Sequence, residues 1–113
     1  MVLPNADRAI IDRVKLEGYV LSSRHPVGRF KARFFTRLGF TAERWRLFEQ
    51  ALREQHLGQP AEAGARDAFG QAFTIRAMLQ GPTCAAALVI SVWFIRVGED
   101  HPRFVTAYPG DSR

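Results

Sequence analysis

The stretch AALVISVWFI, residues 86–95, belongs to the longest apolar run of the chain and decides the fold. Apart from Ser91, its residues are apolar at successive positions, and alternate side chains of a strand point to opposite faces. We therefore expect a central strand that is covered on both sides. The run is far too short for a membrane-spanning helix, which needs about 20 apolar residues.

Two further strands flank this run and predict an antiparallel sheet. Residues 69–79 alternate between apolar and polar, and the turn signal Gly81-Pro82 separates them from the central run. Residues 104–108, FVTAY, read as a last strand in which positions 104, 106 and 108 share one face. Residues 68–110 are thus expected to be antiparallel strands that follow one another as a meander.

The part of the chain before residue 58 has helical patterns. We expect a short extended piece at 9–11 and helices over 14–21, from Pro26 to Leu38, and from Thr41 to His56. Gly39 is a normal residue to end the second helix. Residues 58–67, GQPAEAGARD, are polar and rich in Pro and Gly, so we expect a linker loop there. Helices first and strands after them predict one α+β domain over residues 1–113.

Composition narrows the class of partner and the compartment. The net charge of +5 comes almost wholly from arginine, because Lys15 and Lys31 are the only lysines. Arginine suits phosphate geometry and favours nucleic acid or an acidic protein as partner, although a GC-rich genome also favours arginine codons. Cys84 is the only cysteine and is expected in the core. A reducing, cytoplasmic location follows, since no disulfide can form within the chain.

The helix that begins near His25 concentrates the basic chemistry. His25 precedes Pro26 at the helix start, and Gly28 in the first turn allows a phosphate to approach the backbone. Arg29, Arg33 and Arg37 follow at a spacing of four and form one basic stripe. The stripe is interpreted as phosphate-binding, with a solvated helix face as the alternative.

Lys31 differs from these arginines because it falls on the apolar side of the same helix. The apolar arc is formed by Val27, Phe30, Phe34, Phe35 and Leu38. A lysine within such an arc either extends to the surface or is held there for chemistry. We interpret Lys31 as a site residue.

The last strand adds two hydroxyl groups, those of Thr106 and Tyr108, on one face. The alternative is a solvent-facing pair of good strand formers. No zinc spacing, phosphate-binding glycine loop or restriction-nuclease motif occurs in the sequence. A histidine, a lysine and hydroxyls suffice for RNA cleavage without a metal or cofactor, through a base, a cation that stabilises the phosphorane, and an acid.

Four motifs carry a resemblance to a known family. LPNA (3–6), KLxxYxL (15–21), HPVGRFKARFF (25–35) and PRFVTAYP (102–109) resemble domain-of-unknown-function family 6883, for which no activity is established. More loosely, a helix with His and basic residues before a sheet ending in Thr-x-Tyr is similar to the barnase/EndoU/colicin/RelE (BECR) ribonuclease toxins. This second resemblance implies a BECR-like architecture in which His25 is the acid–base residue and Lys31, helped by Arg29, stabilises the phosphate. Thr106 and Tyr108 would then hold or protonate the phosphate oxygens.

Two functional hypotheses follow. The first is a metal-independent endoribonuclease of bacterial toxin type, alone or as the terminal domain of an effector delivered to a target cell. Its partners would be RNA and an acidic antitoxin or immunity protein, with no membrane involved. The alternative is a non-catalytic basic binding module, antitoxin-like or regulatory. Lys31 discriminates between them, since a binding module has no use for an inward lysine.

Overall fold

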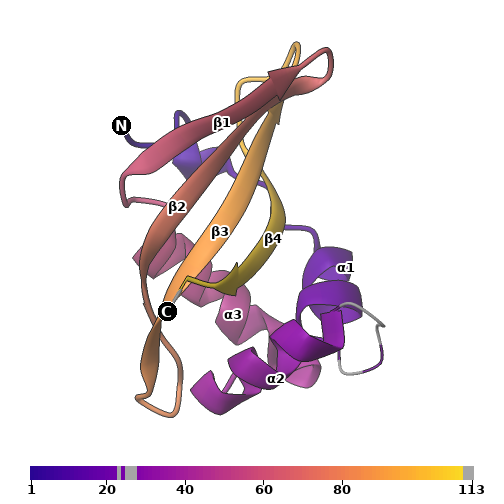
Figure 1. Ribbon diagram of the computed structural model, residues 1–113, viewed down its shortest axis with the longest axis vertical. Helices are drawn as coiled ribbons and strands as arrows, with labels where there is room; N and C mark the ends of the chain where they lie inside the picture. Colours follow the sequence, from indigo (N-terminus) through magenta and orange to yellow (C-terminus); the bar gives the residue numbers. More distant parts are fainter. Residues whose placement is uncertain (23, 25–27, 111–113) are drawn as a thin grey trace.

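The computed structural model describes residues 1–22, 24 and 28–110, with side chains of 28–30 left out of the description. Four strands, β1 (Ala61–Asp67), β2 (Gly70–Gln80), β3 (Ala86–Arg96) and β4 (Arg103–Pro109), form one antiparallel sheet in the order β1-β2-β3-β4. The helices precede the sheet in the chain and pack against one of its faces (Figure 1). The expected α+β fold, with N-terminal helices on a C-terminal meander, is confirmed.

The three expected helices are present. The first consists of α1 (Arg13–Lys15) and the π-helical turn η2 (Leu16–Val20), and it follows the short 3-10 helix η1 (Ala6–Arg8). The second is α2 (Gly28–Leu38), which ends at Gly39 with a φ of 99°. The third runs through η3 (Ala42–Arg44), α3 (Trp45–Ala51) and η4 (Leu52–His56). None of the described helices is long and apolar enough to cross a membrane.

The core lies between the helices and one face of the sheet. Phe48 of α3 contacts two other rings. Its ring centroid lies 4.9 Å from that of Phe35 in α2 and 5.0 Å from that of Phe40, which follows α2 in the chain. On the sheet side, Trp93 is fully buried and meets Phe104 edge-on at 5.3 Å. Aromatic pairs of this geometry stabilise a core beyond the area they bury. This packing holds α2 close to β4.

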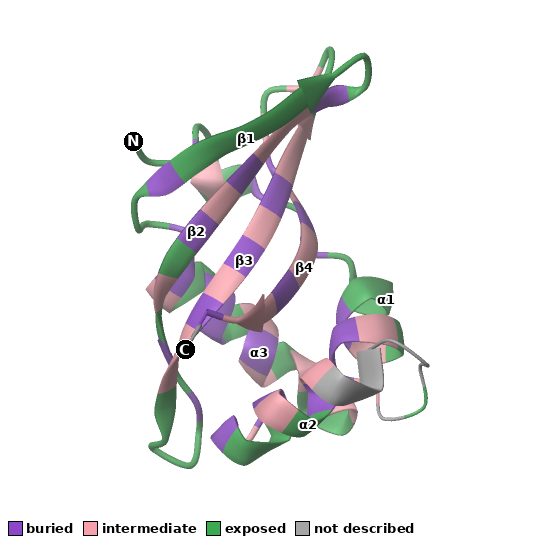
Figure 2. Cartoon of the chain, viewed as in Figure 1, coloured by how far each residue is buried: buried purple, intermediate pink, exposed green. Residues whose placement is uncertain are grey.

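The prediction that the central strand is covered on both sides is wrong. Along β3, Val89, Ser91 and Trp93 are buried against the helices, whereas the intervening residues 88, 90, 92 and 94 are only partly buried (Figure 2). The helices pack on one face, so the other face of the sheet stays open to solvent. We call it the open face. Its β3 side chains are apolar but border polar residues of β2 and β4.

The linker expected over residues 58–67 is also wrong, because residues 61–67 form β1. Ala61 pairs with Ile75 of β2 and is buried, whereas residues 62–67 are all exposed (Figure 2). An edge strand of this kind is held by backbone hydrogen bonds rather than by an apolar face, so it carries no hydrophobic alternation. A bulge between Ala63 and Arg66 disturbs its register further.

Two smaller expectations are corrected. Phe104 does not share a face with Thr106, because the register with β3 shifts between Val92 and Trp93 and leaves Val105 as an extra residue in β4. The bulge turns Phe104 into the core, where it is 3% exposed. Cys84 lies outside the core, in the turn between β2 and β3, where it is exposed and has a φ of 68°.

Candidate functional site

The side-chain ammonium of Lys31 lies where α2, η2 and β4 meet. Its Nζ donates to the hydroxyl of Tyr19 at 2.9 Å and to Oγ1 of Thr106 at 3.1 Å. The same nitrogen lies 4.8 Å from the centre of the Tyr19 ring and 5.9 Å from that of Tyr108. Residues 19, 31, 106 and 108, far apart in the sequence, therefore form one cluster, which we call the Lys31 site.

The position of Lys31 follows from the packing of α2. Phe35 and Leu38 are buried, and Lys31 precedes them by four and seven residues, which places all three on one side of the helix. Lys31 is partly buried, whereas Arg33 and Arg37 are exposed. The inward orientation expected for Lys31 is thus what the structure shows. Of the remaining arc residues, Val27 and the side chain of Phe30 lie outside the described part of the chain.

Thr106 and Tyr108 reach the site from the open face of the sheet. Thr106 is paired with Val92 and Tyr108 with Ile90, two residues of β3 that point away from the core. Paired residues of neighbouring strands project to the same face, so the two hydroxyl-bearing side chains share the open face. Strand β4 is the edge of the sheet next to α2, and Lys31 meets them there (Figure 1).

Tyr19 is the residue of the cluster that the sequence analysis did not single out. Its neighbours Leu16 and Val20 are fully buried, but Tyr19 itself is only partly buried and turns its hydroxyl to Lys31. One signal could have revealed it. Tyr19 and Tyr108 are the only tyrosines of the chain, and both rings contact the same lysine.

The Lys31 site holds a positive charge among neutral groups. Among the residues that the structure describes, Lys31 has no carboxylate within ion-pair distance. Hydroxyls and the faces of aromatic rings stabilise the ammonium without neutralising it. The described residues also contain no group of His, Cys, Asp and Glu that could hold a metal ion. Such a site is suited to an anion that brings its own negative charge, such as a phosphodiester.

The other predicted site residues divide into two groups. Gly28 and Arg29 begin α2, but the side chain of Arg29 is outside the description, as is the whole of His25. Arg33 and Arg37 are exposed on the side of α2 opposite its packed face and form no ion pair with any described residue. The structure thus brings together Lys31, Thr106 and Tyr108 and leaves Arg33 and Arg37 at the periphery.

A second polar cluster, also missed in the sequence, is structural. His56 is fully buried, with Nδ1 2.7 Å from Oγ of Ser91 and Nε2 3.1 Å from the carbonyl oxygen of Ala77. Trp93 donates its indole N–H to the same Ser91 oxygen at 2.8 Å. Burial lowers the pKa of His56, while the hydrogen bond to Ala77 raises it in part. A neutral His56 imidazole that accepts from the Ser91 hydroxyl and donates to the Ala77 carbonyl gives the polar side-chain groups of His56, Ser91 and Trp93 a hydrogen-bond partner each.

Fold and site together define an α+β domain with a lysine-centred polar cluster at the edge of an open sheet. A family model, "Domain of unknown function (DUF6883)", matches residues 2–111, and the chain belongs to this family. No curated protein matches the chain.

A solved structure is similar over nearly the whole chain. It is a chain of the "Contact-dependent growth inhibition toxin - immunity protein complex from Klebsiella pneumoniae 342". The TM-score is 0.59 and the sequence identity 19%, over 95% of this chain and 97% of that chain. At this level of identity the likeness shows a shared fold.

Proposed function

We propose that this protein is a metal-independent endoribonuclease of bacterial toxin type. The observation that carries the proposal is the Lys31 ammonium, which donates to Tyr19 and Thr106, contacts the Tyr108 ring and has no carboxylate among the described residues. A cation kept free of acids, at a sheet edge lined with hydroxyls, matches the charge that develops on a pentacoordinate phosphate. The fold likeness to a chain of a toxin–immunity complex, and the looser resemblance to the BECR ribonucleases, support the toxin class.

The proposed reaction is attack of the RNA 2′-oxygen on the adjacent phosphorus. His25 acts as general base and takes the 2′-hydroxyl proton, and Lys31 stabilises the phosphorane oxygens. Tyr108, 5.9 Å from Lys31 Nζ at its ring centre, supplies the proton to the departing 5′-oxygen, while Thr106 orients a phosphate oxygen. The bond from phosphorus to the 5′-oxygen breaks, leaving a 2′,3′-cyclic phosphate and a free 5′-hydroxyl. Gly28, Arg29, Arg33 and Arg37 bind flanking phosphates.

The proposed partner, besides RNA in a bacterial cytoplasm, is an acidic protein of antitoxin or immunity type. The similar solved structure is named as a complex of a toxin with an immunity protein. The present chain carries a net charge of +5, which favours the toxin side of such a pair and an acidic protein on the other. The second candidate is a non-catalytic binding module, which the same structural likeness favours because the named complex contains an immunity protein.

The proposal is tested with purified protein and total RNA in excess EDTA. We expect discrete fragments whose 3′ ends are 2′,3′-cyclic phosphates. They should resist ligation even after treatment with a phosphomonoesterase, and become ligatable only after the cyclic diester has first been hydrolysed. The reason is that the mechanism uses only side chains of the protein. Fragments that appear only after Mg²⁺ or Mn²⁺ is added, or that carry 5′-phosphates, would rule out this chemistry. Unchanged RNA would favour the binding module.

A further inference from the structure

A hollow of about 340 Å³ lies between the first helix and strands β3 and β4. Val105 lines it and directly precedes Thr106, and Lys15 lines it one helical turn before Tyr19. Both of its walls therefore continue into the Lys31 site. The remaining residues that matter for its chemistry are Asp12, Phe94, Arg96 and Arg103.

Two of the three cations in this hollow are unpaired. Lys15 and Arg96 are exposed and form no ion pair within the described ranges of the chain. Arg103, by contrast, holds Glu99 through two hydrogen bonds of 3.0 Å. The one carboxylate in the wall, that of Asp12, accepts from the backbone N–H of Val14 at 3.0 Å. Asp12 keeps its negative charge, so with Arg103 paired to Glu99 the wall carries two positive charges, of Lys15 and Arg96, against one negative charge.

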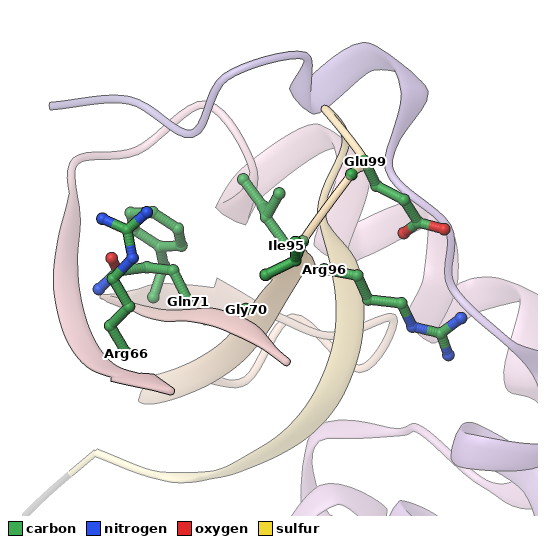
Figure 3. Close-up of a pocket in the computed structure, with 9 residues that line it drawn as sticks. Arg66, Gly70, Gln71, Ile95, Arg96 and Glu99 are labelled. Carbon is green, nitrogen blue, oxygen red and sulfur yellow. The ribbon is translucent and has the colours of Figure 1, made fainter. Parts of the chain in front are cut away.

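Arg96 lines this hollow and also a second one at the same end of the sheet, whereas Arg66 lines only the second. The second hollow, of about 330 Å³, is lined by Arg66, Gln71 and Ile95 among others. Figure 3 shows Arg66 and Arg96 extending away from each other, with Glu99 near the loop that follows Arg96. Arg66 is therefore a control for the loss of one arginine at the same end of the molecule.

Phe94 gives the hollow an aromatic surface between cations. It lies on the open face, is partly buried, and is paired with Arg103 of β4 and Ala72 of β2. An accessible aromatic ring bordered by unpaired cations is the arrangement by which proteins bind single-stranded nucleic acid, with bases stacking on the ring and phosphates meeting the charges.

We propose that Lys15, Phe94 and Arg96 form a subsite for a nucleotide of single-stranded RNA that flanks the phosphate bound at the Lys31 site. This inference rests on the proposed function and specifies its substrate as an unpaired strand. Phe94 is two residues along β3 from Val92, the partner of Thr106. Two residues of a strand span roughly 7 Å, which corresponds to about two stacked nucleotides.

The test measures binding rather than cleavage. The probe is a fluorescent 2′-O-methyl oligoribonucleotide of about eight nucleotides, a length in the range that single-strand sites cover. Such a probe cannot be cleaved because its 2′-oxygens are blocked. We expect Lys15→Ala and Arg96→Ala each to weaken binding about three- to tenfold and to reduce the salt dependence by about 0.7 in log–log slope. Phe94→Leu should weaken binding at least about fivefold with an unchanged slope.

Arg66→Ala is the matched control and should bind within about twofold of wild type, with thermal unfolding checked for every variant. If Lys15→Ala and Arg96→Ala bind like Arg66→Ala, or if the wild type binds no probe, the subsite is wrong. Cleavage in EDTA reports separately on the proposed function. A protein that cleaves RNA but shows no effect of these variants is a ribonuclease without this subsite. A protein that shows the binding effects without cleavage keeps the subsite and loses the ribonuclease assignment.

Discussion

Lys31 shows how a single residue can take on a role that its neighbours in the sequence do not share. Arg33 and Arg37 belong to the same helix and carry the same charge, yet they are exposed, whereas Lys31 is turned toward β4. The difference arises because successive residues of a helix are rotated by about 100°, so Arg33 and Arg37 project from the side of α2 opposite Lys31. The lysine is oriented by the same packing that buries Phe35 and Leu38.

At the residue scale, the first prediction concerns the hydroxyl of Thr106. Thr106→Val keeps the shape but removes the acceptor that Lys31 contacts at 3.1 Å. We expect cleavage in EDTA to slow by about tenfold, because the ammonium loses one of the groups that hold it in place. Stability should change by only about 0.5–1.5 kcal/mol. Thr106→Ser restores the hydroxyl and should recover most of the rate; a serine variant as slow as the valine variant would show that the hydroxyl is not sufficient for the role assigned to it.

The second prediction at this scale concerns His56 and pH. The pKa of His56 is lowered in the folded protein because the ring is buried. In the unfolded chain the ring takes up a proton as the pH falls below about 6.5, while the folded protein leaves it neutral. The contribution of His56 to the free energy of unfolding is therefore complete above about pH 6.5 and is lost as the pH falls toward the lowered pKa.

Urea unfolding at a series of pH values tests this prediction. We expect wild type to lose stability from about pH 7 to 5, and His56→Gln to be less stable at neutral pH but flatter over that window. An equal slope in wild type and His56→Gln would mean that other groups set the acid sensitivity.

At the scale of elements, the sequence predicted the helices and strands that carry a hydrophobic pattern. It missed the strand and the bulge that are set by backbone pairing. Phe73, Ile75 and Leu79 are buried and mark the core face of β2, the strand predicted from the alternation over residues 69–79. Strand β1 was missed because five of its seven residues, EAGAR, carry no apolar alternation and its partner supplies the register. The bulge at Val105 was missed for a related reason, since an extra residue in a strand is specified by pairing with β3 and not by side-chain type.

The cluster around Lys31 could likewise be predicted only in part. Lys31, Thr106 and Tyr108 could be found because each breaks or repeats a local pattern within its own element. Their contact with Tyr19 could not, because it depends on how η2 packs beside α2, and the π-helical turn shifts that face from the one an α-helix would present.

The prediction for α2 as an element separates its two faces. Arg33→Ala and Arg37→Ala should weaken RNA binding more than they lower the single-turnover rate at saturation, because both side chains are exposed on the side away from the Lys31 site. Each should also reduce the dependence of binding on salt by about 0.7 in log–log slope on single-stranded RNA. Filter binding and single-turnover cleavage over a range of salt concentrations measure both effects. Unchanged binding and slope would make the stripe an ordinary solvated face.

On the scale of the whole molecule, the sheet separates the packed core from the face that carries the proposed site. One face is closed by the helices and contains the aromatic core and the buried His56 cluster. The open face carries Thr106, Tyr108 and Phe94, with Lys31 and Lys15 contributed from helices beside the β4 edge. Variants on the open face should therefore change activity or binding with little change in stability, and variants on the closed face should do the reverse.

The central claim is that the Lys31 ammonium stabilises the phosphate during cleavage, and the single-turnover rate of Lys31→Met in EDTA tests it most directly. Methionine keeps much of the length and packing but removes the charge. We expect the rate at saturating RNA to fall by about 10²–10³, with the thermal unfolding midpoint close to that of wild type. Arg33→Ala, one exposed charge removed from the same helix, should cleave at nearly the wild-type rate. A folded Lys31→Met protein that cleaves as fast as wild type would contradict the account.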